Sequence, residues 1–139
     1  MELSKISACG RPVDMRYPTN RAILLITFVV MIVNLFIIRL LGIAWGESLR
    51  LAAAMAVGVF LSWALAREIC PDEEYGAFVG IVVTIAGYWL LSAGNLLVLV
   101  LMLFLLRQIN RSTGLSPAVL DIVIMIGLAS WLAIQVHWV

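Results

Sequence analysis

The chain has 139 residues, of which 64% are hydrophobic and 12% are charged, and its formal net charge is +1. Soluble domains carry roughly 45–50% apolar and about 25% charged residues, so this composition excludes an ordinary soluble fold. The net charge gives no sign of a nucleic-acid partner. We expect the lipid bilayer to be the main partner, with no nucleic acid.

The apolar residues form continuous runs, often more than ~18 residues long, which is typical of transmembrane helices. A β-barrel would instead show alternating apolar and polar positions. The sequence therefore predicts an all-α, polytopic (multi-pass) protein of the cell membrane. We expect a cytoplasmic arm over residues 1–21 and a single transmembrane helical domain over residues 22–139. The first apolar run is too long for a signal peptide, so we expect no cleavage.

The first helix is predicted over residues 22–45, with Thr19 or Asn20 as its N-cap and Gly46 at its end. Two of its side chains are polar in an otherwise apolar run. Polar groups inside a membrane helix are costly unless they find a partner or extend to the headgroups. We predict that the arginine of this helix extends to the headgroups; an inward-facing anion or proton site is the alternative. With an asparagine beyond the third helix, the intramembrane polar candidates are Asn34, Arg39 and Asn95.

The second helix is predicted over residues 48–69, opened by Glu47 or Ser48. Small residues recur every four positions along it, and glycines recur every seven positions in the next apolar stretch. Small side chains on one stripe let two membrane helices approach closely, so these two stripes are predicted to meet. The helix-packing candidates are Ala54, Gly58, Ser62, Gly80 and Gly87.

The stretch 76–109 is apolar throughout and has one charge, near its end. As a single helix it would be ~51 Å long, far beyond the ~30 Å hydrocarbon core. A break at residues 92–95 instead gives two short helices, over 76–91 and 96–109, and returns Tyr88 and Trp89 to an interface. A final helix is predicted over 117–136. Five helices also place most arginines on the cytoplasmic side, as the positive-inside rule requires; the alternative is four helices.

Five helices bring three polar segments to one side of the membrane. An Asp–Arg pair there would join helix ends and could bind a lipid phosphate, because a guanidinium donates two hydrogen bonds to phosphate oxygens. Loosely paired, solvated loop charges are the alternative. The candidates for this anion or lipid-headgroup site are Arg67, Arg107, Arg111 and Asp121.

The adjacent acids at 72–74 are typical of a solvated turn, so we expect no metal site, and no sequence feature indicates a cofactor. No serine or cysteine is predicted to lie beside a histidine base, and we expect no catalytic residue. The sequence thus favours a non-enzymatic membrane subunit or scaffold, which assembles with itself or with other membrane proteins through the apolar face of residues 96–106. A small oligomeric transporter or channel, and an interfacial enzyme acting on lipid headgroups, are the alternatives.

Overall fold

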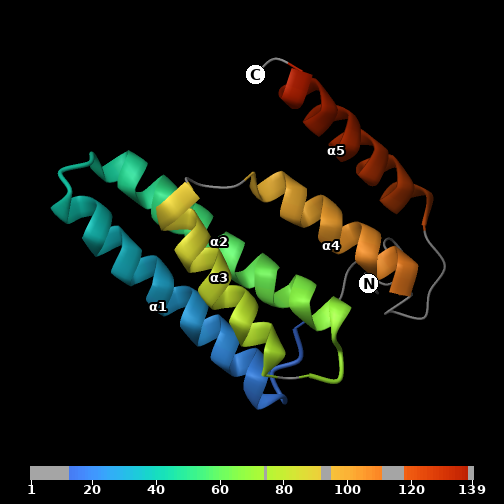
Figure 1. The fold of residues 1–139 in the computed structure, drawn as a ribbon, viewed down its shortest axis with the longest axis horizontal. Helices are drawn as coiled ribbons and strands as arrows, with labels where there is room; N and C mark the ends of the chain where they lie inside the picture. Colours follow the sequence, from blue (N-terminus) through green and yellow to red (C-terminus); the bar gives the residue numbers. More distant parts are fainter. Residues whose placement is uncertain (1–12, 74, 92–94, 111–117, 138–139) are drawn as a thin grey trace.

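A computed structural model describes residues 13–73, 75–91, 95–110 and 118–137. These residues form five α-helices and no β-strand, which confirms the predicted all-α class and helix number. The four-helix alternative is wrong, because residues 76–109 form two helices on either side of residues 92–95. The helices are α1 (Pro18–Leu40), α2 (Trp45–Ile69), α3 (Gly76–Leu91), α4 (Leu96–Asn110) and α5 (Val119–His137) (Figure 1).

The ends of α1 differ from the prediction. The helix begins four residues early, at Pro18, whose fixed φ and missing N–H suit the first helical turn. Its N-cap is Tyr17, so Thr19 and Asn20 are not caps. It ends at Leu40 because Gly42 adopts a left-handed φ of 83°, a conformation that breaks the helix and strains most other residues.

Helix α2 starts earlier than predicted, because the chain turns at Gly42. The turn is complete by Ala44, which is the N-cap, and the helix begins at Trp45 rather than at Glu47 or Ser48. The buried Ser48 hydroxyl instead donates to the carbonyl oxygens of Ile43 (3.1 Å) and Ala44 (2.9 Å). This residue therefore stabilises the first turn from inside the helix.

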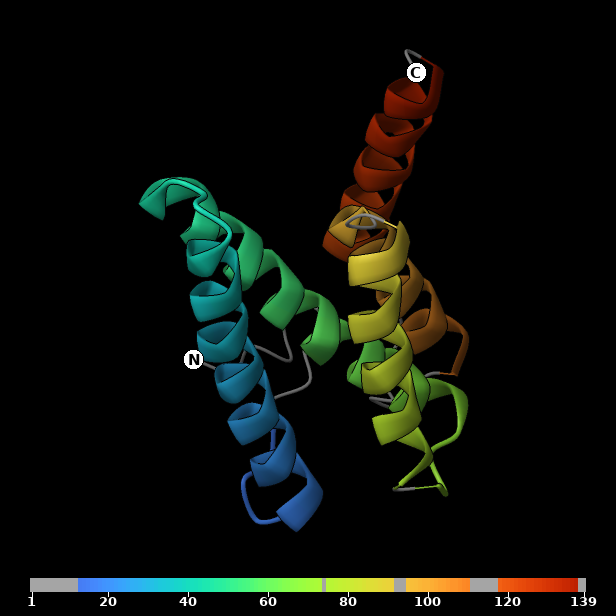
Figure 2. The same ribbon diagram turned by 60° about the vertical axis from the view of Figure 1, so that its left-hand side comes forward.

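Helix α2 is the centre of the fold. It packs against α1, α3 and α4, whereas α5 packs against α4 and against no other of the described helices. Both views place α5 at the edge of the bundle, beyond α4 (Figures 1 and 2). The core lies along α2, where apolar side chains of neighbouring helices meet its buried face. The buried residues of this core are Ile23, Val59, Leu61, Trp63, Ala64, Ala77, Ile81 and Leu103.

The prediction that residues 96–106 face only lipid or a partner is incomplete. Leu103 of α4 is buried in the core beside α2, and α4 also contacts α5. Other residues of the same helix, such as Val98 and Met102, are exposed. Helix α4 therefore joins the central helix to the outermost one and leaves only part of its surface free.

Two helices of the described part of the chain, α1 with 23 residues and α2 with 25, are long and apolar enough to cross a membrane by length and composition. The apolar helices α3 and α4 have 16 and 15 residues. At 1.5 Å per residue these two are only about 24 and 22 Å long.

Candidate functional site

The up-and-down course of the chain collects polar groups at one end of the bundle. The starts of α1 and α5 and the ends of α2 and α4 lie at this end (Figure 1). Two of the predicted anion-site residues, Arg67 and Arg107, approach each other here and line one pocket. Arg111, the third arginine of that set, lies outside the described residues.

The strongest polar contact at this end is an ion pair between Glu68 of α2 and Arg107 of α4. The Nε of Arg107 donates to Oε1 of Glu68 over 3.1 Å, and the two side chains are only 15% and 7% exposed, respectively. The side-chain amide of Asn110 donates to the main-chain oxygen of Glu68 over 2.7 Å. These contacts fix the ends of α2 and α4 side by side.

Arg67 and Trp63 lie one turn apart on α2 and share an unusual property. The Nη1 atom of Arg67 and the Nε1 atom of Trp63 are buried and have no hydrogen-bond partner. Buried N–H groups in folded proteins are almost always paired, because leaving one unpaired costs its full desolvation. Two such donors on one helix face therefore mark a place where an acceptor belongs.

Both residues line a pocket of about 380 Å³ at the polar end of the bundle. One part of its wall is charged or polar and another part is apolar, so the pocket is amphipathic. Its lining residues are Val13, Asp14, Tyr17, Asn20, Phe60, Trp63, Ala64, Arg67, Glu68, Pro71, Leu103 and Arg107.

Asp121, predicted to pair with an arginine, has a structural role at the start of α5. Its carboxylate accepts a hydrogen bond from the main-chain N–H of Ala118, the residue before the helix, over 3.1 Å. An acid three positions into a helix that reaches back in this way forms half of a capping box. Asp121 is only 2% exposed. A buried carboxylate with this contact stabilises the helix start.

Asn95 is also a cap. Its side-chain oxygen accepts from the N–H of Leu97 over 3.0 Å, the usual contact of an N-cap residue, and the residue is exposed. The break between α3 and α4 thus ends with a residue that starts the next helix. Among its described contacts nothing links Asn95 to Arg39.

The two predicted intramembrane polar residues of α1 are held by local contacts. The buried Asn34 donates to the carbonyl oxygen of Val30 over 2.9 Å, while its own side-chain oxygen has no partner. The guanidinium of Arg39 donates to the Ile43 oxygen and lies 4.4 Å from the centre of the Trp45 ring. This cation–π contact closes the α1–α2 turn.

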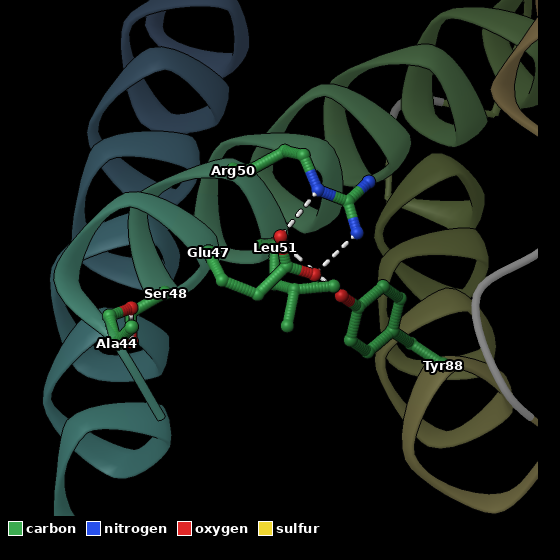
Figure 3. A network of polar contacts seen from close by, with 6 residues as sticks. All are labelled: Ala44, Glu47, Ser48, Arg50, Leu51 and Tyr88. Carbon is green, nitrogen blue, oxygen red and sulfur yellow. Dashed lines mark hydrogen bonds and ion pairs between the residues drawn. The ribbon is translucent and has the colours of Figure 1, made fainter. Parts of the chain in front are cut away.

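A second polar network lies at the opposite end of the bundle (Figure 3). Arg50 donates to both carboxylate oxygens of Glu47, over 2.9 and 2.5 Å, and the two side chains are 67% and 47% exposed, respectively. The Tyr88 hydroxyl of α3 donates to the Leu51 carbonyl of α2 over 3.2 Å. The network joins helix ends and shows no buried donor without a partner.

The predicted small-residue stripes meet at two points. A Cβ atom at Gly80 of α3 would lie 3.4 Å from the Ser62 carbonyl oxygen of α2, and one at Gly58 of α2 would lie 3.7 Å from a Thr84 methyl group of α3. A Cβ atom at Gly87 would have no neighbour within 4 Å. Ala54 is half-buried on α2. The close approach between α2 and α3 is therefore concentrated at Gly80.

Reasoning from sequence named neither Trp63 nor Glu68 among the site candidates. The available signal was spacing, because Trp63 and Arg67 are four positions apart and share one helix face. Within the described ranges no group of three or more His, Cys, Asp or Glu side chains could hold a metal ion. Cys70 is a free, exposed thiol. Comparison of the chain with protein-family models, curated proteins and solved structures gives no match.

Proposed function

We propose that this chain is a multi-pass protein of the cell membrane that acts as a non-enzymatic subunit. All five helices lie in the bilayer in this proposal, with residues 1–21 on the cytoplasmic side. The observation that carries it is the apolar outer surface of the helices. A soluble protein covers such surface, because contiguous exposed apolar patches beyond a few hundred Å² are rare on soluble monomers.

Helix α1 illustrates this surface. Only 17% of its most apolar 18-residue window is buried inside the molecule, so it is unlike the core helix of a soluble protein. Its exposed large side chains recur every three to four residues and form one apolar stripe. They are Leu24, Leu25, Phe28, Val29, Val33, Phe36, Ile37 and Leu40. Hydrocarbon is the solvent that suits a continuous stripe of this kind.

The short helices are compatible with a bilayer. Helices α3 and α4 fall a few ångströms short of the ~30 Å hydrocarbon core, and a membrane adapts to such a mismatch by thinning locally. Their exposed side chains are apolar as well, for example Val82 and Val83 of α3 and Met102 of α4. In this arrangement the polar ends of both helices reach the headgroup regions.

The distribution of arginines supports the orientation. Arg16, Arg21, Arg67 and Arg107 belong to the end of the bundle that holds the pocket. Arg39 and Arg50 belong to the opposite end. Because cytoplasmic loops of membrane proteins are enriched in Lys and Arg, the pocket end is assigned to the cytoplasm.

Thiol labelling tests the membrane topology. In a Cys9→Ser background, we expect a membrane-impermeant maleimide to label the exposed Cys70 only from the cytoplasmic side. A Cys70→Ser variant carrying Asn95→Cys should be labelled only from outside, because the α3–α4 break lies at the other end. Labelling in detergent gives the fully reactive control. Labelling of both positions from one side, or release of the chain by alkaline carbonate, would contradict the proposal.

The proposed assembly surface is α5. This helix packs against α4 only, and most of its described side chains are exposed. Small residues also lie on its exposed surface: Gly127, Ser130 and Ala133 are three positions apart, and a Cβ atom at Gly127 would meet nothing within 4 Å. Small residues at such spacing allow another membrane helix to approach closely, which supports α5 as the contact with a second subunit.

Cross-linking in native membranes tests this surface. In a chain without its two native cysteines, Ser130→Cys on α5 should give a cross-linked species with a bismaleimide. Phe36→Cys, on the equally exposed stripe of α1, is the matched control and should not. A product of twice the chain mass identifies a second copy, and a different mass identifies another subunit. Monomer alone from Ser130→Cys would overturn the subunit proposal.

A further inference from the structure

We infer that the pocket at the polar end of the bundle is a binding site for a phosphate group, with Arg67 and Trp63 as its hydrogen-bond donors. The proposed subunit role does not require such a site. The inference starts from the two buried donor atoms, Nη1 of Arg67 and Nε1 of Trp63. Both residues line the same pocket, and one acceptor group bound there pairs with both donors once the side chains turn toward it.

Burial makes the missing acceptor significant. Trp63 is only 6% exposed, and the Nη1 atom of Arg67 is inaccessible although the rest of that side chain is half-buried. Neither N–H group therefore has free access to bulk water. An indole N–H can only donate, and a guanidinium has donors but no acceptor, so a ligand group at this place must be an acceptor.

The charges in the pocket point to an anion. Glu68 and Arg107 form an ion pair with each other. Asp14 lies 4.0 Å from Arg16 and accepts the main-chain N–H of that residue over 2.9 Å. Arg67 forms no ion pair with any of the residues that the structure describes. The charge of Arg67 is therefore the positive charge of the pocket that no described acid balances. A phosphodiester carries one negative charge and can balance it.

Phosphate is the anion that best fits the donors and the space. A guanidinium binds phosphate oxygens through two parallel hydrogen bonds, and a tetrahedral group has further oxygens for the indole N–H. The volume of about 380 Å³ lies within the range of ligand pockets and exceeds what a small carboxylate needs. The apolar part of the wall, which includes Phe60 and Leu103, suits the carbon atoms attached to the phosphate.

Two sources could supply this group, a phospholipid headgroup and a water-soluble phosphate. The lipid source rests on the proposed function, because it requires the pocket end of the bundle to lie at the level of the headgroups. The shared chemistry does not depend on a bilayer. The test therefore includes probes of both kinds.

The experiment uses the full chain in a neutral detergent, and native mass spectrometry measures bound ligand. The probes are phosphatidylglycerol, the matching diacylglycerol without phosphate, and inorganic phosphate. We expect phosphatidylglycerol to bind and diacylglycerol not to bind. Arg67→Gln should weaken binding by about tenfold or more, the effect of losing a charged hydrogen bond. Trp63→Phe, which keeps the ring and removes the N–H, should weaken it several-fold.

Arg21→Gln is the matched control, since this exposed arginine belongs to the same end of the bundle, donates to the main-chain oxygen of Met15 and does not line the pocket. It should leave binding unchanged, which separates a built site from general attraction of anionic lipid. If Arg67→Gln does not fold, Arg67→Lys keeps the charge and loses the paired donors, and it should still weaken binding.

The outcomes identify the source of the phosphate group and, separately, test whether the site exists. Arg67-dependent binding of inorganic phosphate identifies a soluble phosphate and supports the site even if the membrane proposal fails. Arg67-dependent binding of phosphatidylglycerol alone identifies a lipid headgroup. Equal binding of diacylglycerol, unchanged binding in both Arg67→Lys and Trp63→Phe, or no binding of any probe would overturn the inference.

Discussion

Replacing Glu68 with glutamine is expected to lower the free energy of unfolding by about 3–5 kcal/mol, the usual cost of removing one partner of a buried ion pair. The variant keeps the shape of the side chain but removes the negative charge that faces the Arg107 guanidinium, which is only 15% exposed. It also weakens a contact between two helices that are not consecutive in the chain. Unfolding by a denaturing detergent, followed by circular dichroism, measures the change.

Two comparisons make this result specific. Glu47→Gln removes a pair whose side chains are far more exposed, so it should change stability much less. The double variant Glu68→Leu with Arg107→Leu should be more stable than Glu68→Gln, because no uncompensated charge remains buried. If Glu47→Gln and Glu68→Gln lower the free energy of unfolding equally, burial of the Glu68–Arg107 pair does not contribute to stability as argued.

Gly80→Val is expected to destabilise the fold by about 1–3 kcal/mol, the typical cost of forcing extra methyl groups into a packed interface. A Cβ atom there already lies 3.4 Å from the Ser62 oxygen and 3.7 Å from the Ala66 Cβ. The branches of valine would push α3 away from α2. The free energy of unfolding in the same denaturing detergent measures the loss.

Gly87→Val is the matched control for this substitution. It makes the same chemical change on the same helix, where a Cβ atom would meet nothing within 4 Å. Any effect of the valine on helix propensity is therefore common to both variants, and the difference between them reports the contact with α2. Equal losses at the two glycines would contradict a close approach at Gly80.

The helices could be predicted from the sequence because each is a long apolar run bounded by polar or helix-breaking residues. The bounds of α3 agree with the prediction, and α4 ends one residue later than predicted. The first two helices were placed less well. The run from 22 to 45 is predominantly apolar up to and beyond the turn, and only the left-handed conformation at Gly42 shows where the chain turns.

The site was less predictable than the fold, for a physical reason. Spacing along a helix indicates which residues share a face, but not which residue of another helix lies opposite. The pair between Glu68 and Arg107 spans 39 positions and depends on how α2 and α4 are aligned. The caps were missed for a different reason: Asn95 and Asp121 each accept a hydrogen bond from a main-chain N–H nearby in the sequence, and the prediction considered only partners across the bundle.

The central position of α2 has a consequence for biosynthesis. A chain is made from its N-terminus, so α2 can pack against α1 as soon as both are present. Glu68 emerges at the end of this first hairpin, but Arg107 follows 39 positions later. During that interval the carboxylate lacks its α4 partner, and one wall of the pocket has not been made. Packing of α4 against α2 brings Arg107 to the Glu68 carboxylate and adds Leu103 and Arg107 to the pocket wall, so the two events occur together during synthesis.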